Sequence, residues 1–196
     1  IVKGLCEKFQ GTVYLTARDE TRGHNAVQKL QKLGLTPKFH QLDITDDASV
    51  EKFHDFIKAQ HGGIDVLVNN AAIAFKQNAT ESFAIQAEET IRVNYYGTLR
   101  VCRKLFGLLR DNARVVNVSS SAGRLSRIPG KDLRAKLADD SLTVEGLNAL
   151  MDGFVKSAKE GRNETDGWGA SAYTVSKVGV SALTRIQQRE MDREKP

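Results

Sequence analysis

Short apolar runs alternate with helical patterns along this chain, and that alternation constrains its fold more than any other feature. The runs have the length and composition of buried strands and cover residues 12–17, 38–42, 64–68 and 114–118. Between them, apolar residues recur at the spacing of amphipathic helices, with glycines closing the first two patterns, over about 27–33, 50–57 and 88–109. We therefore expect an α/β fold, a doubly wound parallel sheet with helices on both faces.

The composition is that of an ordinary globular domain. The chain has 196 residues, of which 40% are hydrophobic and 27% charged, so we expect one domain over residues 1–196. The formal net charge is +5, yet the basic residues are scattered through the predicted helices instead of forming a tract. This pattern favours solvated helix faces and some attraction for an anionic cofactor over a nucleic-acid partner.

Cysteine usage and the distribution of apolar residues bear on the compartment. Cys6 and Cys102 both fall in amphipathic helical patterns and suggest neither a disulfide framework nor a metal site. The histidines form no cluster at metal-ligand spacing. No run approaches the ~18 apolar residues of a membrane span, and no charged-then-apolar leader opens the sequence. We expect a cytoplasmic protein with no membrane or metal partner.

Tyr173 and Lys177 form the most informative chemical pattern. Residues four apart lie on the same face of a helix. Tyrosine ordinarily loses its proton near pH ~10, so it is a poor catalyst at neutral pH unless a neighbouring cation stabilises the phenolate. Lys177 is placed to supply that cation, and a serine from the run Ser119–Ser121 would hold a carbonyl oxygen while Tyr173 protonates it. Taken alone, this spacing is also typical of a surface helix without chemistry.

Further motifs accompany this pair in a fixed order. Asn69-Asn70-Ala71-Ala72 follows the strand at 64–68, Asn94 stands in a helical stretch, and the serine run follows the strand at 114–118. With these motifs in this order, the chain resembles the short-chain dehydrogenase/reductase family over almost its whole length. The resemblance implies a Rossmann-type sheet and an oxidoreductase.

The resemblance assigns four residues to catalysis: Asn94, Ser120, Tyr173 and Lys177. Tyr173 would protonate the carbonyl oxygen as hydride reaches the carbon, and Ser120 would hold that oxygen. Lys177 would lower the pKa of Tyr173 and hold the nicotinamide ribose, while Asn94 would bind a water that resupplies protons. From the residues alone, a serine-rich turn at 119–121 and a solvent-facing Asn94 remain alternatives.

The resemblance also implies NADPH as the cofactor. An acidic residue at the end of the strand at 12–17 would bind the ribose 2'-hydroxyl of NAD, but Ala17 takes that place, and Arg18 follows as a cation suited to a 2'-phosphate. A salt bridge from Arg18 to Asp19 or Glu20 is the alternative. The other predicted cofactor contacts are Asp43 at the adenine edge, Asn69 and Ala71 near the adenosine ribose, and Tyr173 with Lys177.

A glycine-rich turn that would cradle the pyrophosphate of a dinucleotide is absent from this sequence. The chain starts at Ile1 in what reads as the back half of a helix, and family members continue beyond the place of Pro196. We therefore expect the first strand, the glycine turn and the C-terminal strands to lie outside this sequence. The first strand would sit between those at 12–17 and 64–68, so an apolar slot with unpaired edges should open there.

Residues 124–169 separate the serine run from Tyr173 by more than in many family members, which marks them as a helical insertion. Apolar residues from Leu147 to Ala158 follow the spacing of an amphipathic helix packed on the domain. The insertion resembles the carbonyl reductase group, monomeric enzymes whose extra helices cover the surface that others use for tetramer assembly. Trp168 would be either a wall of the substrate site or a core anchor.

The resemblance thus predicts an NADPH-dependent reductase that converts aldehydes, ketones or quinones to alcohols and acts as a monomer on a small-molecule substrate. A non-catalytic nucleotide sensor on the same fold is the alternative. Such sensors commonly lose the tyrosine or the serine, and this chain retains both. Epimerases and dehydratases that share the tyrosine and lysine usually depart from the Asn-Asn-Ala pattern, which this chain also retains.

Overall fold

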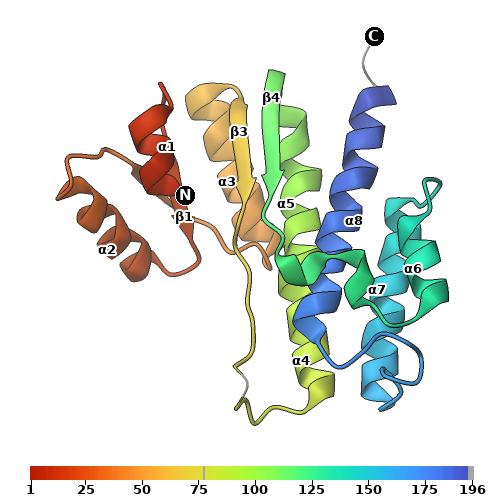
Figure 1. The fold of residues 1–196 in the computed structure, drawn as a ribbon. Helices are drawn as coiled ribbons and strands as arrows, with labels where there is room; N and C mark the ends of the chain where they lie inside the picture. Colours follow the sequence, from red (N-terminus) through yellow and green to blue (C-terminus); the bar gives the residue numbers. More distant parts are fainter. Residues whose placement is uncertain (77, 194–196) are drawn as a thin grey trace.

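Strands and helices alternate along the chain as predicted (Figure 1). The computed structural model describes residues 1–76 and 78–193. Its strands are β1 (Tyr14–Ala17), β2 (Lys38–Gln41), β3 (Ile64–Asn69) and β4 (Leu109–Asn117). Its α-helices are α1 (Val2–Lys8), α2 (Glu20–Gln31), α3 (Asp47–His61), α4 (Phe83–Thr90), α5 (Thr98–Leu105), α6 (Lys131–Ala138), α7 (Val144–Lys159) and α8 (Ala172–Arg193). In the described part of the chain, no helix combines the length and apolar character needed to cross a bilayer.

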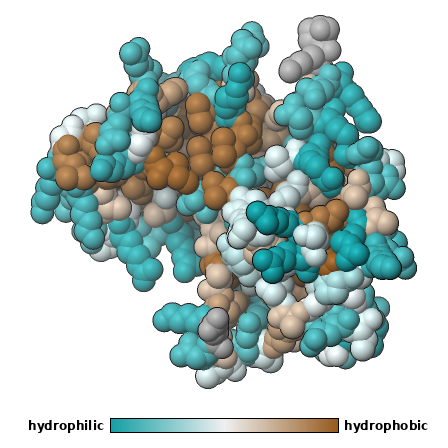
Figure 2. Space-filling model, viewed as in Figure 1, coloured by the Kyte–Doolittle hydropathy of each residue, from teal (hydrophilic) through white to brown (hydrophobic). Residues whose placement is uncertain are grey.

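The strands form two parallel pairs. β1 pairs with β2 and β3 pairs with β4, and within the described residues no backbone pairing joins β1 to β3. A cavity of about 710 Å³ lies between these two edges, lined by side chains of both, such as Leu15 and Val66. Figure 2 shows hydrophobic side chains gathered on the face of the molecule where α1, β1 and β3 lie. The opening is in the place where a further strand is expected from the sequence.

Helices lie on both faces of the sheet. Successive side chains of a strand point to opposite faces. On β2, the ring of Phe39 lies 4.5 Å from that of His24 in α2. The ring of the next residue, His40, lies 5.0 Å from Phe53 and 4.4 Å from Phe56, both in α3. α2 and α3 therefore cover opposite faces, which confirms the doubly wound arrangement.

A layer formed by α3, α5 and α8 positions the functional part of the chain. In Figure 1 α3 and α5 lie behind β3 and β4, and α8 runs beside α5. Side-chain hydrogen bonds join β3 to α5, from Asn69 to Cys102, and β4 to α8, from Asn117 to Thr184. These contacts hold α8 next to β4, with its first turns near the carboxyl end of that strand. Open α/β sheets bind their ligands at this end.

The larger hydrophobic core lies among α4, α7, α8 and the turn between α4 and α5. Its members include the fully buried Tyr95, Phe154 and Leu183. Trp168 belongs to this core, since it is 5% exposed and its ring centroid lies 5.5 Å from that of Phe154. Of its two expected roles, the structure therefore supports the core anchor. α7 confirms the amphipathic helix predicted over Leu147 to Ala158.

The predicted helix over 88–109 is wrong in two respects. A π-helical turn, η1 (Ile91–Gly97), interrupts it between α4 and α5, and such turns are rare and frequently lie at functional sites. The helix also ends early, through a 3-10 turn η2 (Phe106–Leu108), and Leu109 already pairs with Ile64. β4 thus starts before 114. The mostly polar residues 110–113 lie at a break in register between the Leu109 and Arg114 pairings, so their hydropathy does not predict the strand.

Candidate active site

Tyr173 and Lys177 lie in the first turns of α8, one turn apart. Lys177 is only 4% exposed, and its Nζ donates a hydrogen bond to the backbone oxygen of Val118 at 2.8 Å. The same Nζ lies 5.8 Å from the centre of the Tyr173 ring. Burial lowers the pKa of Lys177, because removing an ammonium group from water disfavours its charged form. The structure therefore brings the predicted acid and the predicted cation together.

The serine run follows β4 and packs against the same part of α8. The Oγ of Ser119 lies 2.8 Å from that of Ser181 and donates to the backbone oxygen of Lys177 at 3.2 Å. Ser120 is half-buried and begins the 3-10 turn η3 (Ser121–Gly123), where its Oγ accepts a bond from the Ala122 amide at 3.2 Å. Because Ser120 accepts in that bond, its hydroxyl proton stays available to a substrate oxygen.

Gly123 makes this close packing possible, although no motif in the sequence singles it out. A Cβ at this position would lie 2.4 Å from the Oγ of Ser119 and 2.8 Å from the backbone oxygen of Lys177. Real side chains do not approach so closely, so only glycine lets the serine run approach α8 to this extent. The available signal was a glycine soon after the serine run, but glycine is common in any turn.

Asn94 is 1% exposed and lies in the π-helical turn η1. Its Oδ1 accepts a bond from the Ile73 amide at 2.8 Å. Its Nδ2 donates to the Ile73 carbonyl at 2.9 Å and to the Oγ of Ser176 at 3.0 Å. The alternative of a solvent-facing asparagine is therefore wrong. The amide joins the segment after β3 to α8, next to Lys177, and its water-binding role stays a prediction.

Two predicted nucleotide contacts lie near each other at the carboxyl ends of β1 and β2. Arg18 follows β1 and is exposed. Asp43 follows β2, and its Oδ1 accepts bonds from the amide and the hydroxyl of Thr45 at 2.9 and 2.7 Å. Burial raises the pKa of Asp43, but the Thr45 bonds and the charges of Arg18 and Arg92 outweigh that effect and keep the pKa below its ordinary value. An exposed cation and a carboxylate thus share this edge.

Asn69 and Ala71 lie at and just beyond the carboxyl end of β3, where both line the cavity between the strand pairs. The Asn69 side chain is already engaged, since its Nδ2 donates to the Oδ1 of Asn117 at 2.8 Å and to the Sγ of Cys102 at 3.2 Å. A cofactor contact at Asn69 would therefore use its backbone. Ala71 is exposed and has no polar side chain, so the same holds there.

The family is decided by comparison with known proteins. A family model described as short chain dehydrogenase matches residues 1–131. The chain belongs to this family. Among curated relatives, this short-chain dehydrogenase is 46% identical to carbonyl reductase (NADPH) 1 of Rattus norvegicus, over 100% of this chain and 71% of the relative. It is 47% identical to the Bos taurus protein of the same name, with the same shares covered.

Solved structures of other reductases share the fold of this short-chain dehydrogenase. Salutaridine reductase from Papaver somniferum superposes with a TM-score of 0.88 at 33% identity, over 97% of this chain and 77% of that one. Menthone neomenthol reductase from Mentha piperita gives a TM-score of 0.86 at 31% identity, over 96% and 79%. The family and the fold predicted from the sequence are thereby confirmed.

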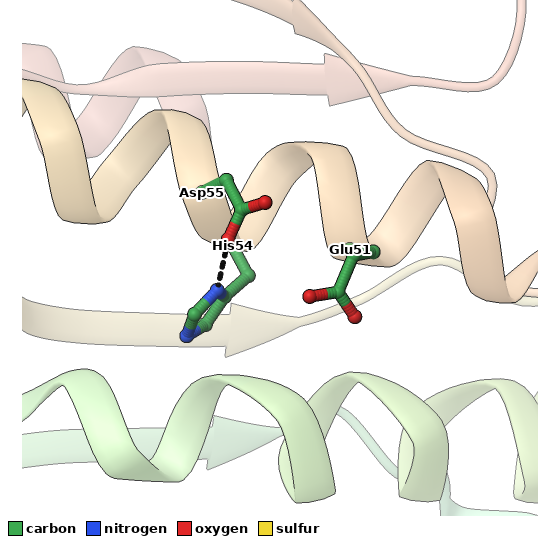
Figure 3. Close-up of side chains that lie close together, drawn as sticks. All are labelled: Glu51, His54 and Asp55. Carbon is green, nitrogen blue, oxygen red and sulfur yellow. Dashed lines mark hydrogen bonds and ion pairs between the residues drawn. The ribbon is translucent and has the colours of Figure 1, made fainter.

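The described residues of this short-chain dehydrogenase offer one group with the spacing of a metal site, on α3. It consists of Glu51, His54 and Asp55, and Figure 3 shows His54 bonded to Asp55, with an Nδ1 to Oδ1 distance of 2.9 Å. Glu51 is paired with Lys104 of α5, which already neutralises its charge. Both carboxylate residues are exposed, and nothing else at the cluster points to a ligand. We assign it no role.

Proposed function

We propose that this protein reduces aldehydes, ketones or quinones to alcohols with NADPH, at a site formed by Ser120, Tyr173 and Lys177. The observation that carries the proposal is the buried ammonium of Lys177 held 5.8 Å from the centre of the Tyr173 ring. Relatives at 46% and 47% identity are named NADPH carbonyl reductases, which supports the same activity and cofactor.

The residues at the site suit protonation of a carbonyl oxygen. NADPH, when bound, supplies the hydride. Ser120 would hold the carbonyl oxygen through its free hydroxyl proton, and Tyr173 would donate its phenol proton to that oxygen. The cation at Lys177 favours the phenolate that remains, because an opposite charge nearby stabilises an ionised group. Asn94 would not touch the substrate. Its amide would hold the segment at Ile73 against α8.

The residues at the sheet edge fit an NADPH cofactor. The carboxyl ends of β1, β2 and β3 carry the proposed contacts Arg18, Asp43, Asn69 and Ala71. Arg18 is exposed, so its guanidinium is open to a 2'-phosphate, with which it would form a forked ion pair. Lys177 would also hold the nicotinamide ribose.

We propose that the chain forms one domain over 1–196 with a helical insertion at about 124–169, and that the protein is a monomer. α7, from the insertion, packs on α4 and η1, where Tyr95 bonds Asn148 at 2.8 Å and Lys159 pairs with Glu88 at 2.7 Å. These contacts support the proposal that α7 covers the helix face through which the family resemblance implies that related enzymes assemble. Light scattering at micromolar concentration should give the monomer mass, and a stable tetramer would contradict this.

A cytoplasmic location is also proposed. Cys6 and Cys102 are both free thiols, which suits a reducing compartment. Cell fractionation, with a resident cytoplasmic enzyme as the marker, should recover the protein in the same fraction. Recovery with a membrane or organelle fraction would contradict this location.

The activity is tested with the purified full-length protein. NADPH absorbance should fall when a reactive ketone or quinone is added, and the corresponding alcohol should appear in equal amount. The same assay without a carbonyl compound is the control. If NADPH binds in calorimetry but no carbonyl compound in a broad panel is reduced, the sensor alternative replaces the proposed enzyme.

A further inference from the structure

Ser176 lies inside the catalytic turn of α8, between Tyr173 and Lys177, and is fully buried. Its Oγ donates a hydrogen bond to the backbone oxygen of Tyr173 at 2.8 Å. The same oxygen accepts a bond from the Nδ2 of Asn94 at 3.0 Å. A single hydroxyl thus joins the residue proposed as the acid to the asparagine of another helix.

The direction of these bonds is fixed. A serine hydroxyl has one proton, and here the Tyr173 carbonyl takes it, since a carbonyl can only accept. Toward Asn94 the hydroxyl can therefore only accept, so Asn94 must present its NH2 group to α8 and its Oδ1 to the Ile73 amide. In the reverse orientation, Oδ1 would face an oxygen and NH2 would face an N–H, which leaves buried groups without partners.

Through Asn94, Ser176 reaches the segment that follows β3. The Asn94 amide forms hydrogen bonds with both the N–H and the C=O of Ile73, at 2.8 and 2.9 Å. Ile73 follows directly on the segment Asn69–Ala72, which carries proposed cofactor contacts. The chain of contacts therefore runs from the backbone of Tyr173 through Ser176 and Asn94 to the backbone that follows the proposed cofactor contacts Asn69 and Ala71.

We propose that Ser176 is a positioning residue, which fixes the Asn94 amide so that the segment after β3 and Tyr173 keep their relative placement. The proposal rests on the proposed function, because it concerns the geometry of that reaction. The hydroxyls of Ser181 and Thr184 also donate to carbonyls one turn back on α8, but neither bonds to Asn94, so Ser176 differs from them in this second bond. Loss of the Ser176 hydroxyl should slow the chemical step more than it weakens substrate binding.

The test compares Ser176→Thr with Ser176→Val in the full-length protein. Threonine and valine have the same shape, so the pair differs only in the hydroxyl. Ser176→Val should lower kcat about tenfold while KM for the carbonyl substrate changes less than about twofold, since orientation and not binding is lost. Ser176→Thr should recover most of kcat. Ser157→Ala is the matched control, because Ser157 is a buried serine of α7 that bonds Asp166.

A second measurement does not depend on turnover. The Ile73 amide is protected by the Asn94 oxygen, so its hydrogen exchange should be at least about tenfold faster in Ser176→Val than in Ser176→Thr. Equal kcat and equal Ile73 exchange in the two variants would overturn the positioning role. If valine prevents folding, Ser176→Ala and Ser176→Cys supply the same comparison. Wild-type protein that turns over no carbonyl compound would instead contradict the proposed function, whatever the exchange data show.

A double-mutant cycle with Asn94→Ala separates positioning from general packing. If Ser176 acts through Asn94, the two substitutions should not add, and Ser176→Ala should have little further effect on kcat in the Asn94→Ala background. Additive effects would mean that Ser176 acts by some route other than Asn94 and would overturn the proposal.

Discussion

The Nζ of Lys177 lies 2.8 Å from the backbone oxygen of Val118, the residue between β4 and the serine run. This bond ties the first turns of α8 to the carboxyl end of the sheet, and the bonds of Ser119 to Lys177 and Ser181 join the serine run to the same part of the helix. The backbone oxygen offers no negative charge, and within the described residues no carboxylate pairs with Lys177 within 4 Å. The ammonium charge is thus not neutralised by an ion pair among these residues, as the proposed stabilisation of the Tyr173 phenolate requires.

The buried state of Lys177 predicts a pH-dependent stability. Its pKa is lowered in the folded protein, against an ordinary value of 10.5, so the folded state binds fewer protons than the unfolded state between those two values. The free energy of unfolding of the wild type should therefore rise with pH in that window relative to Lys177→Met. Chemical denaturation at neutral pH and near pH ~10 measures the difference. Lys29→Met, at an exposed lysine, is the control. If the difference in unfolding free energy between the wild type and Lys177→Met is the same at both pH values, the lowered pKa is contradicted.

Gly123→Ala should push the serine run away from α8. The new methyl group would lie 2.4 Å from the Oγ of Ser119, so the loop must shift, with a loss of about 1–3 kcal/mol in unfolding free energy and of most of kcat. Gly153→Ala, in an exposed turn of α7 with no atom within 4 Å, is the matched control and should be neutral or stabilising. Wild-type kcat in Gly123→Ala would mean that Ser120 does not need this placement.

Arg18→Asp should erode the preference for NADPH over NADH by at least about tenfold in the ratio of kcat/KM values, because repulsion replaces attraction for the 2'-phosphate. The neighbouring acid Asp19 pairs with Arg22 at 3.8 Å, which leaves Arg18 to the ligand. Arg22→Asp makes the same charge change one turn into α2 and should leave the preference nearly intact. An unchanged ratio in Arg18→Asp would place the 2'-phosphate elsewhere.

The strands and the turn of α8 that carries Tyr173 and Lys177 could be predicted from the sequence because their signals are local. Apolar runs of five or six residues and a tyrosine four residues before a lysine are visible without knowledge of neighbours. The resemblance to a family then supplied the roles. The opening between β1 and β3 was also predictable, since strand order places a further strand there.

Features that depend on distant contacts were missed. The π-helical turn around Asn94 goes with bonds to Ile73 and Ser176, which are 21 and 82 residues away in sequence. The hydrogen bond from Asn69 to Asn117 spans 48 residues. It occupies the Asn69 side chain, which the sequence motif predicts as a cofactor contact. No period or spacing in one sequence reports such pairs.

The central claim is that Tyr173 donates the proton, and single-turnover oxidation of NADPH by Tyr173→Phe tests it most directly. Phenylalanine keeps the ring beside Lys177 and removes only the hydroxyl. We predict that the rate of NADPH oxidation with a reactive carbonyl compound falls at least ~100-fold, as expected for loss of a positioned acid, while NADPH affinity in calorimetry changes less than about threefold. A single-turnover rate equal to that of the wild type would contradict the account.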